Sequence, residues 1–492
     1  MGDKDIMPFK TLDKYWKVKS RLLSKDDLDS IHWATLDVME KTGIRIHSEK
    51  ASKILDDAGA SVDYKKQIAK IPAHLVEEAL RKAPKHIRLY ARNPKFDIKL
   101  DGKHVYFSTD GIGIATIDFE TGKKRDSTKK DVATAAIITD ALEDLHIYWP
   151  IVIASDVPQQ AHVLHELEAS LNNTEKPITM DATSKLEEAV YEVKMLAEAV
   201  GGEEELRKRP IAHAFECTVA PLILEGGATD AALEFSRVGI PVAFMSMPHA
   251  GITAPITLAG TMVINNAEVL SSLTISEMAN PGAPVMYSAV PSMPDLRTGQ
   301  YSGGIPESAL LFAAGAQIAR YYGLPSMVGG FGPNAKIPRP QATYESVFFA
   351  LTPALVGADI LCGVGLLDGD TLLSFEQLII DYEIGTILLR LIRGFDVNEE
   401  TLALDLINKL GPGGNYLIEK HTLEHVHECW RPMISHVSSY GAWVADGSKN
   451  VVQVAREKVK EILATHEPTP LDVDVQKRVS RIVSEGEKKI PH

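Results

Sequence analysis

The sequence predicts an α/β protein built on a (β/α)8 (TIM) barrel, with an N-terminal helical cap and C-terminal helical additions. The main observation is a recurring unit in which a short apolar run is followed by a helical stretch. Runs without polar–apolar alternation are typical of strands buried on both faces, and such strands alternating with helices form a parallel sheet. Several such units in succession favour a closed barrel over an open sheet. The predicted strands are Ile147–Ala154, Pro177–Asp181, Pro210–Cys217, Pro241–Pro248, Pro284–Pro291, Pro325–Phe331 and Asp359–Gly365.

Residues 1–100 differ from this pattern and predict a small helical cap. Ser24 precedes acidic residues and an apolar helical periodicity, so we expect it to be an N-cap. Residues 101–126 alternate apolar side chains such as Val105, Phe107, Ile112 and Ile114 between glycines. This region predicts one or two β-hairpins that cover an end of the barrel.

The barrel itself, with the helices that follow it, is predicted to occupy residues 127–465. Its first helix is expected to begin after Ser127 as the N-cap. Residues 466–492 are rich in charge and contain Pro468 and Pro470, so they predict a charged C-terminal tail.

Composition limits the possible functions. The chain has 492 residues, of which 45% are hydrophobic, and a formal net charge of −14. An acidic chain argues against nucleic-acid binding, which favours a basic face. The first residues lack the apolar core of a signal peptide, and the most apolar stretch, residues 346–367, is interrupted by proline, aspartate and glycine. We therefore expect a cytoplasmic protein without membrane spans, and we expect a homo-oligomer.

Common catalytic and metal-binding motifs are absent from the sequence. It contains no dinucleotide-binding glycine fingerprint, no complete P-loop and no hydrolase nucleophile elbow. Cys217, Cys362 and Cys429 form no C-x-x-C pair, which argues against a zinc-thiolate site. The histidines at 421, 425 and 427 fit structural or surface roles better than a metal site, and a third possibility is that His421 lines the pocket. We therefore predict neither a metal nor a tightly bound cofactor.

The residues at the ends of the predicted strands form an aromatic and methionine-rich set with few charges. Aromatic faces attract cations through the ring quadrupole, and quaternary ammonium ions are bound in this way. The set therefore predicts a site for a methylated ammonium, with an arginine or histidine for a carboxylate at the other end of the ligand. Its members are Trp149, Met180, His213, Phe215, Glu216, Phe244, Met245, Met247, His249, Tyr287, Asp295, Arg297 and Phe331.

At this point the chain resembles the trimethylamine methyltransferase family, which transfers a methyl group from a methylamine to a corrinoid. The matching segments keep their order over more than 400 residues. They are Leu36–Gly43, Ile71–Pro84, Tyr90–Pro94, Lys336–Ser346, Leu373–Ile384, and Gly413–Leu417 with His421–Leu423. The resemblance implies a TIM barrel that holds the methyl donor, and a separate small corrinoid-binding protein that docks over its mouth and carries the cobalamin.

The family divides at one position near Gly329–Lys336, where the trimethylamine enzymes carry pyrrolysine. This chain has only standard residues there, so it resembles the branch whose members demethylate quaternary amines such as glycine betaine. Proline betaine, carnitine and γ-butyrobetaine remain open as substrates. The family also implies an acidic pair at Asp381 and Glu383, and a segment near the site that contains Gln341, Tyr344 and Glu345.

The predicted substrate-binding residues combine strand position with this resemblance. Phe331, Tyr287 and Phe244 are expected near the ammonium, and His213, His249, Arg297 or Arg339 near a carboxylate. Gln341, Tyr344, Glu345, Asp381 and His421 complete the set, and no catalytic residue is assigned. The alternatives are a non-catalytic betaine-binding or regulatory barrel and an unrelated barrel lyase, which needs a phosphate loop or carboxylate–metal site that the sequence lacks.

Overall fold

The computed structural model of the chain describes residues 20–111 and 113–491. Residues 1–19 of the predicted cap, Ile112 of the predicted hairpin region and His492 of the predicted tail lie outside the described residues.

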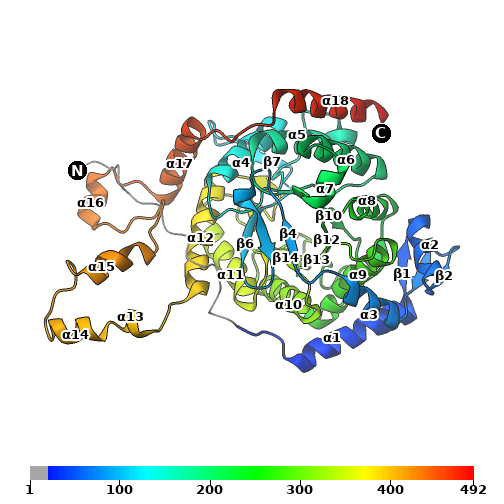
Figure 1. Ribbon diagram of the computed structural model, residues 1–492, viewed down its shortest axis with the longest axis horizontal. Helices are drawn as coiled ribbons and strands as arrows, with labels where there is room; N and C mark the ends of the chain where they lie inside the picture. The colour runs from blue at the N-terminus through cyan, green and yellow to red at the C-terminus, as the bar shows by residue number, and fades with distance from the viewer. Residues whose placement is uncertain (1–19, 112, 492) are drawn as a thin grey trace.

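A curled sheet of seven parallel strands forms the centre of the molecule (Figure 1). Its order is β6-β15-β14-β13-β12-β10-β9, so most neighbouring strands are also consecutive βα units along the chain. The strands are buried almost throughout, as expected for a sheet covered on both faces. They are β6 (Tyr106–Thr109), β9 (Ile178–Thr179), β10 (Ala212–Cys217), β12 (Val242–Ser246), β13 (Val285–Ala289), β14 (Ser326–Gly329) and β15 (Ile360–Val364).

One predicted strand, Ile147–Ala154, appears only as single bridges rather than as a regular strand. Ile147 forms a parallel bridge with Ser108 beside β6, and Tyr148 forms one with Ile178 of β9. The Tyr148 amide donates to the Pro177 carbonyl at 3.0 Å. The segment therefore lies between the two edge strands of the sheet.

Helices surround the sheet on its outer side (Figure 1). Most of them follow a strand, and they pack apolar and small side chains against the strands and the neighbouring helices. They are α4 (Lys129–Ala141), α5 (His162–Asn173), α6 (Leu186–Val200), α7 (Glu203–Lys208), α8 (Gly226–Arg237), α9 (Leu258–Ala279), α10 (Pro306–Tyr322), α11 (Pro340–Val356) and α12 (Phe375–Arg393). Thr128, not the predicted Ser127, caps α4, because the Ser127 hydroxyl donates instead to the Ile153 carbonyl.

The N-terminal region contains strands as well as the predicted helices. Ser24 caps the first helix in a reciprocal capping box with Asp27, as predicted. The helices are α1 (Lys25–Asp37), the π-helical turn η1 (Val38–Thr42), α2 (Glu49–Asp57), α3 (Ala73–Lys82) and the short turn η2 (Pro94–Phe96). The strands are β1 (Ile44–Ile46), β2 (Ser61–Asp63), β3 (Ile68–Lys70), β4 (Ile87–Leu89) and β5 (Ile98–Leu100).

Two small sheets explain why this region is not purely helical. β1, β3 and β2 form a sheet with β11 (Ile223–Leu224), a strand from the loop after β10, which joins the N-terminal region to the body of the protein. The β4–β5 hairpin packs its apolar face against residues inside the curled sheet, such as Met286, Met327 and Ile360. The hairpin therefore closes the amino-terminal end of the parallel strands.

The prediction for residues 101–126 was partly wrong. β6 belongs to the central parallel sheet, where it pairs with β15, so the sheet begins before residue 127. The rest of the region forms the predicted hairpin, β7 (Ala115–Ile117) and β8 (Lys124–Asp126). This hairpin pairs with β17 (Leu372–Leu373), which pairs with β16 (Leu366–Leu367).

The C-terminal part consists of an extension from the body and two packed helices. Figure 1 shows α13 (Glu399–Leu402), α14 (Leu404–Leu410), α15 (Lys420–His425) and α16 (Tyr440–Ala445) extending away from the barrel body. The short turn η4 (Val426–Glu428) follows α15, and α17 (Val451–Thr465) packs on α12 and α4. The predicted charged tail is instead the helix α18 (Val473–Lys489), which packs on α5 and α6 through one apolar stripe.

Across residues 20–111 and 113–491, no helix has both the length and the apolar character needed to cross a membrane.

Candidate functional site

A cavity of about 430 Å³ lies at the carboxyl ends of the parallel strands. This volume is in the range of ligand-binding sites, and the carboxyl end of such a sheet is where α/β enzymes bind substrates. Almost all of its lining comes from strand ends and the loops that follow them. The lining residues are Asp110, Trp149, Phe215, Thr218, Val219, Ala220, Met245, Met247, His249, Thr253, Val290, Tyr301, Phe312, Gly329, Phe331, Cys362, Gly369 and Asp370.

The walls of the cavity are mainly aromatic rings and thioethers. Trp149 and Phe215 pack together with ring centroids 4.4 Å apart. Phe331 lies on another side, edge-on to Phe107 at 5.7 Å. A Cβ atom on Gly111 would lie 1.7 Å from Trp149 Nε1, so glycine is needed there for the indole to occupy its place. Such walls suit a ligand that presents methyl groups and a diffuse positive charge.

Two carboxyl groups, Asp110 and Asp370, also line the cavity. Burial raises the pKa of Asp110 to about 6, although the Gly111 amide donates to its carboxyl at 2.8 Å and opposes the rise. Burial, together with the charge of Asp110, raises the pKa of Asp370 well above its ordinary value, while the Tyr301 hydroxyl opposes that rise. Burial and mutual repulsion therefore suppress part of the negative charge that two free carboxylates would carry.

Asp370 is fitted closely into the loop that carries Phe331. Gly332 has a φ of +81°, and a Cβ atom there would lie 1.7 Å from Asp370 Oδ1. Asp370 itself has a φ of +66°. The backbone of both loops is thus adapted to place this carboxyl at the cavity.

His249 and Cys362 are two further ionisable groups that line the cavity. Burial lowers the pKa of His249, and its Nδ1 lies 2.7 Å from Ser292 Oγ, so the imidazole is neutral at pH 7. Its ring centroid is 6.0 Å from that of Tyr301. Burial raises the pKa of the Cys362 thiol well above its ordinary value, and the thiol donates to the Val328 carbonyl at 3.2 Å.

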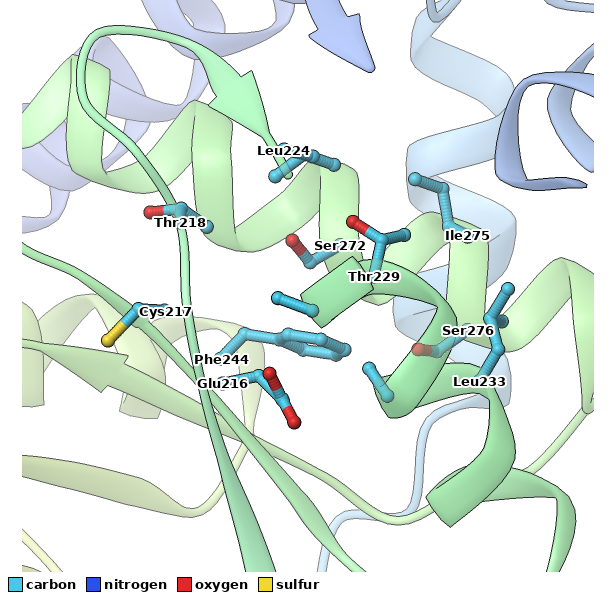
Figure 2. A pocket seen from close by; sticks show the side chains of 12 residues that line it. Glu216, Cys217, Thr218, Leu224, Thr229, Leu233, Phe244, Ser272, Ile275 and Ser276 are labelled. Carbon is cyan, nitrogen blue, oxygen red and sulfur yellow. The ribbon is translucent and has the colours of Figure 1, made fainter. Parts of the chain in front are cut away.

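Of the predicted substrate-binding residues, Phe331 and His249 line the cavity, whereas Phe244 and Tyr287 do not. Successive side chains of a strand point to opposite faces, and on β12 and β13 it is Met245 and Met286 that face inward. Figure 2 shows Phe244 and Glu216 directed towards α8 and α9, beside a separate cavity of about 20 Å³. The Tyr287 hydroxyl contacts Asn265 and Asn266 of α9 at 3.0 and 3.2 Å.

His213 and Arg297 also lie outside the cavity. His213 is fully buried on β10, one inward-facing position deeper than Phe215, and its Nε2 lies 3.0 Å from Thr179 Oγ1. Burial lowers the pKa of His213 to about 3. Arg297 belongs to a loop after β13, and its exposed side chain pairs with Asp295 at 3.0 Å. Arg339 is exposed as well, at the N-cap of α11.

None of the three residues predicted on α11 lines the cavity, and only Glu345, with Gln341, supports a loop beside it. Glu345 is buried and accepts a hydrogen bond from the Ala335 amide at 3.3 Å and another from Gln341 at 3.0 Å. Its carboxyl also lies against Gly304, where a Cβ atom would approach within 2.4 Å. Tyr344, by contrast, is 59% exposed.

Neither Asp381 nor His421 is among the lining residues, although the charge of Asp381 contributes to the raised pKa of Asp370. Asp381 accepts hydrogen bonds from the Gly365 amide at 3.0 Å and from Gln377 at 2.8 Å, and burial raises its pKa to about 7. His421 lies on α15 with its ring centroid 4.3 Å from that of His425. Both predicted residues therefore contact other groups of the chain, and neither lines the cavity.

The described residues contain one group of side chains with metal-ligating geometry, His162, Glu166 and Asp181. His162 Nδ1 lies 3.1 Å from Glu166 Oε1, and the Ala154 amide donates to the same oxygen at 2.8 Å. Although burial opposes it, pairing with Glu166 raises the pKa of His162 to about 9. These contacts describe a buried ion pair beside an aspartic acid whose pKa is raised to about 8 by burial and by Glu166.

Sequence reasoning missed the two acids and Tyr301. Asp110 follows β6, which was assigned to a cover hairpin, so its position at a strand end was not recognised. Asp370 and Tyr301 lie on loops whose spatial position the strand pattern does not give. The one available signal was local: Asp110 and Asp370 stand beside Gly111 and Gly369, and glycine permits close approach of the chain.

Fold and site together define an α/β protein with an enzyme-type cavity, suited to a small methylated cation, at the carboxyl ends of its parallel strands. The sequence profile of the family described as trimethylamine methyltransferase (MTTB) matches residues 10–491. The chain therefore belongs to the trimethylamine methyltransferase family.

Individual relatives agree with this assignment. The chain is 37% identical to the trimethylamine methyltransferase MttB of Methanosarcina barkeri (strain Fusaro / DSM 804), over 96% of each chain. It is 31% identical to a glycine betaine methyltransferase of Desulfitobacterium hafniense (strain Y51), over 96% of this chain and 98% of that one.

Among solved structures, the monomethylamine methyltransferase MtmB of Methanosarcina barkeri has a similar fold. It matches with a TM-score of 0.51 and 13% identity, covering 89% of this chain and 93% of that chain. At this identity the likeness concerns the fold alone.

Proposed function

We propose that the protein transfers a methyl group from a small quaternary amine to the Co(I) of a corrinoid held by a separate, small partner protein. The observation that carries this proposal is the cavity itself. Its aromatic and thioether walls surround two carboxyl groups, and no lysine or arginine is among the described lining residues. A quaternary ammonium supplies the positive charge that this lining lacks.

Asp110 and Asp370 change which interactions are expected to hold the substrate cation. The sequence suggested a mouth with few charges, in which aromatic rings alone hold the cation. Asp110 and Asp370 add a Coulombic attraction that is strong in a buried site. Because the ammonium loses its charge during transfer, this attraction favours the bound substrate more than the transition state. A pair with part of its charge suppressed holds the cation less tightly than two full carboxylates would.

The reaction needs no acid or base from the protein. The N–CH₃ bond breaks as the methyl carbon is attacked by the cobalt nucleophile that the partner supplies, and the bonding electrons remain on nitrogen. The leaving group is a neutral tertiary amine. The chain's own contribution is to bind the cation, to direct one methyl group towards the mouth and to exclude water.

Glycine betaine is the substrate that we propose first. Its carboxylate needs a donor, and His249 is the only basic side chain among the lining residues of the described chain. A neutral imidazole donates one hydrogen bond without a full charge, which suits a cavity that already contains two acids. The glycine betaine methyltransferase of Desulfitobacterium hafniense (strain Y51) supports a quaternary amine donor.

Trimethylamine is the second candidate donor. The relatives named trimethylamine methyltransferase are 35–37% identical to this chain, a closer match than the glycine betaine enzyme. Against it, the segment Gly329–Lys336 contains only standard residues, and Asn334 there bonds to the Ser302–Gly303 loop rather than lining the cavity.

We also propose that the sheet is a closed (β/α)8 barrel, with residues 147–148 as its eighth strand. This segment has parallel bridges on both sides. Backbone hydrogen bonds support both pairings: the Ile147 amide donates to the Phe107 carbonyl at 3.2 Å and the Thr179 amide to the Tyr148 carbonyl at 2.9 Å.

The test is a methyl-transfer assay with the purified chain and its cognate corrinoid protein reduced to Co(I). Glycine betaine, proline betaine, carnitine, γ-butyrobetaine, choline and trimethylamine are compared. We expect a quaternary amine to give the spectrum of the methylated corrinoid, and one equivalent of the demethylated amine by mass spectrometry.

Other outcomes separate the alternatives. Transfer from trimethylamine alone would support the second candidate. Saturable binding of a betaine, without transfer to an active corrinoid protein, would instead support a non-catalytic binding protein. Choline matches glycine betaine in its ammonium group but lacks the carboxylate, so comparing their KM values tests the role of His249.

A further inference from the structure

The two acids at the cavity can accept more hydrogen bonds than the chain donates to them. A carboxylate offers about four lone-pair positions. Asp110 accepts a hydrogen bond from the Gly111 amide at 2.8 Å, and the Tyr301 hydroxyl donates to Asp370. Asp370 is 6% exposed, and its Oδ1 has no hydrogen-bond partner among the described residues. Because a buried acceptor without a donor destabilises the site, the cavity favours a ligand that supplies the donor.

A quaternary ammonium is not such a donor. Its nitrogen carries four carbon substituents and no hydrogen, so it attracts an acid by charge alone. A tertiary amine that has taken up a proton carries one N–H bond, and charge-assisted hydrogen bonds of this kind are about twice as strong as neutral ones. No lysine or arginine of the described chain lines the cavity to compete for the acids. The acids are therefore suited to the class of molecule that demethylation of a quaternary amine produces.

We propose that Asp370 binds the demethylated product as a protonated tertiary amine, through an N–H···O hydrogen bond, and that the retained product inhibits the enzyme. This inference rests on the proposed function, because only a quaternary donor yields a tertiary amine. The two acids then have different tasks. Asp110 attracts the substrate cation, and Asp370 holds the product.

The acid also supplies the proton. Methyl transfer leaves a neutral tertiary amine with a free lone pair in the cavity. Burial and the charge of Asp110 raise the pKa of Asp370 well above its ordinary value and so favour its protonated form. The amine is the stronger base. Its lone pair forms the N–H bond, the O–H bond of the carboxyl breaks, and the electrons of that bond remain on oxygen. The transfer step itself still needs no acid, because the proton moves afterwards.

The N–H bond has two consequences. The lone pair is no longer available to take the methyl group back from cobalt, so the transfer does not reverse while the product stays bound. The ammonium–carboxylate pair also holds the product in the place that the next substrate needs. The Tyr301 hydroxyl stabilises this state, because its hydrogen bond favours the ionised form of Asp370.

The experiment measures the binding of four amines to the purified full-length chain by calorimetry at pH 7, without the corrinoid protein. Trimethylammonium is compared with tetramethylammonium, and N,N-dimethylglycine with glycine betaine. Each pair differs only in an N–H bond where the quaternary member has a methyl group. Burial of that methyl group alone would make the quaternary member bind about fourfold tighter. We expect instead that the tertiary member binds about tenfold tighter, because of its charge-assisted hydrogen bond.

Asp370→Asn tests the assignment to this acid. Asparagine tolerates the left-handed φ of +66° at this position, and its amide has nearly the shape of the carboxyl without its charge. The variant should bind the two members of each pair within about fourfold of each other, as the methyl group alone predicts. Asp368→Asn is the matched control and should keep the preference. Asp368 lies on the same loop with a φ of +57°, but it pairs with Lys336 at 2.6 Å and does not line the cavity.

Several results would overturn the inference. They are tighter binding of the quaternary members to the wild type, no binding of either tertiary amine, and a folded Asp370→Asn variant that keeps the preference. Where circular dichroism shows that this variant does not fold, the comparison of trimethylammonium with tetramethylammonium on the wild type decides alone. In the transfer assay, N,N-dimethylglycine should compete with glycine betaine, with an inhibition constant below the KM of glycine betaine. Methyl transfer from either tertiary amine would make it a substrate and overturn its role as an inhibitor.

The two proposals fail in different ways. A chain that prefers the tertiary amines but transfers no methyl group to an active corrinoid protein would contradict the proposed function and leave the ammonium site at Asp370 in place. Methyl transfer from a quaternary amine without the preference would support the proposed function and exclude the retained product.

Discussion

At the scale of single residues, the site depends on two acids whose environment keeps part of their charge suppressed. Asp110 accepts a hydrogen bond from one backbone amide, and Asp370 lies against the loop that contains Gly332. Neither residue faces a lysine or arginine among the described residues that line the cavity. The natural counter-ion for the remaining charge is the substrate cation, and this makes binding dependent on pH.

Asp110→Asn tests that dependence. The pKa of Asp110 is raised to about 6 in the empty cavity, and a bound cation favours the ionised form. The affinity for a quaternary ammonium should therefore increase as the pH rises through 6, by about tenfold for each unit by which the cation lowers that pKa. Asp110→Asn should flatten this profile, weaken binding about tenfold or more at pH 8, and raise KM more than it changes kcat.

Calorimetric titration of glycine betaine and of choline between pH 5 and 8 measures this directly. Asp295→Asn is the matched control, because Asp295 pairs with Arg297 on an exposed loop outside the lining. An Asp110→Asn variant with the affinity and pH profile of the wild type would exclude the acid pair as the cation site.

At the scale of elements, the sequence predicts well which segments form buried strands. It predicts poorly which side chains of each strand point towards the cavity. Six of the predicted apolar runs contain strands of the central sheet, because runs such as Pro241–Pro248 lack alternation and are bounded by helical periodicity. The same lack of alternation hides which residues point inward. Phe244 and Met245 are both apolar and both buried, and only the structure shows that Met245 faces the cavity.

Short or polar elements were the ones that the sequence did not predict. β6 has four residues and lies between Asp101-Gly102 and Asp110-Gly111, which are typical of hairpin turns, so the sequence predicts a hairpin there. The sequence predicts a charged tail at α18 because only one stripe of this helix is apolar. Val479 and Val483, with Ile490 directly after the helix, are buried where α18 packs on α5 and α6. Its stability therefore comes from tertiary packing, which composition does not reveal.

Val483→Asp tests whether α18 is part of the folded body. Val483 is 2% exposed, so the substitution buries an unpaired carboxylate and should lower the free energy of unfolding by about 2–4 kcal/mol, or release the helix. Urea unfolding measures the loss, and limited proteolysis near residue 470 detects release. Val473→Asp, at an exposed first-turn position of the same helix, should change stability by less than about 0.5 kcal/mol. Equal effects of both variants would contradict the packed arrangement.

At the scale of the whole molecule, several carboxyl groups are buried between the parallel strands and the helices without cationic partners. Burial, with the charges of Glu192, Glu188 and Asp181, raises the pKa of Glu216 well above its ordinary value. Both Glu216 oxygens lack a hydrogen-bond partner among the described residues. The adjacent cavity of about 20 Å³ has room for one water molecule, which would satisfy them. Such acids stay protonated in the folded chain and ionise in the unfolded chain.

The sign of the resulting pH dependence follows from these shifts. An acid whose pKa is raised by folding stabilises the fold only at low pH, and the fold loses stability as the pH rises through the folded value. Here the pKa values reach about 6 for Asp110, 7 for Asp381 and 8 for Asp181, and the pKa of Glu216 is also raised well above its ordinary value. Buried neutral histidines such as His213 act in the opposite direction, but only below their ordinary pKa of 6.5. Above pH 6.5 the loss from the acids is therefore unopposed by these histidines.

We accordingly expect the thermal and urea midpoints of unfolding to decrease as the pH is raised from 7 to 9. Glu216→Gln should make this decrease smaller. The amide has nearly the shape of the protonated acid but does not ionise, so the variant should gain stability over the wild type as the pH rises towards the folded pKa of Glu216, by at most about 1.4 kcal/mol for each pH unit. At pH 5 the two proteins should differ little. Thermal and urea unfolding at pH 5, 7, 8 and 9 measure the difference, with Glu187→Gln, an exposed residue in the first turn of α6, as the matched control. A constant offset between Glu216→Gln and wild type at every pH would show that Glu216 is already ionised in the folded protein.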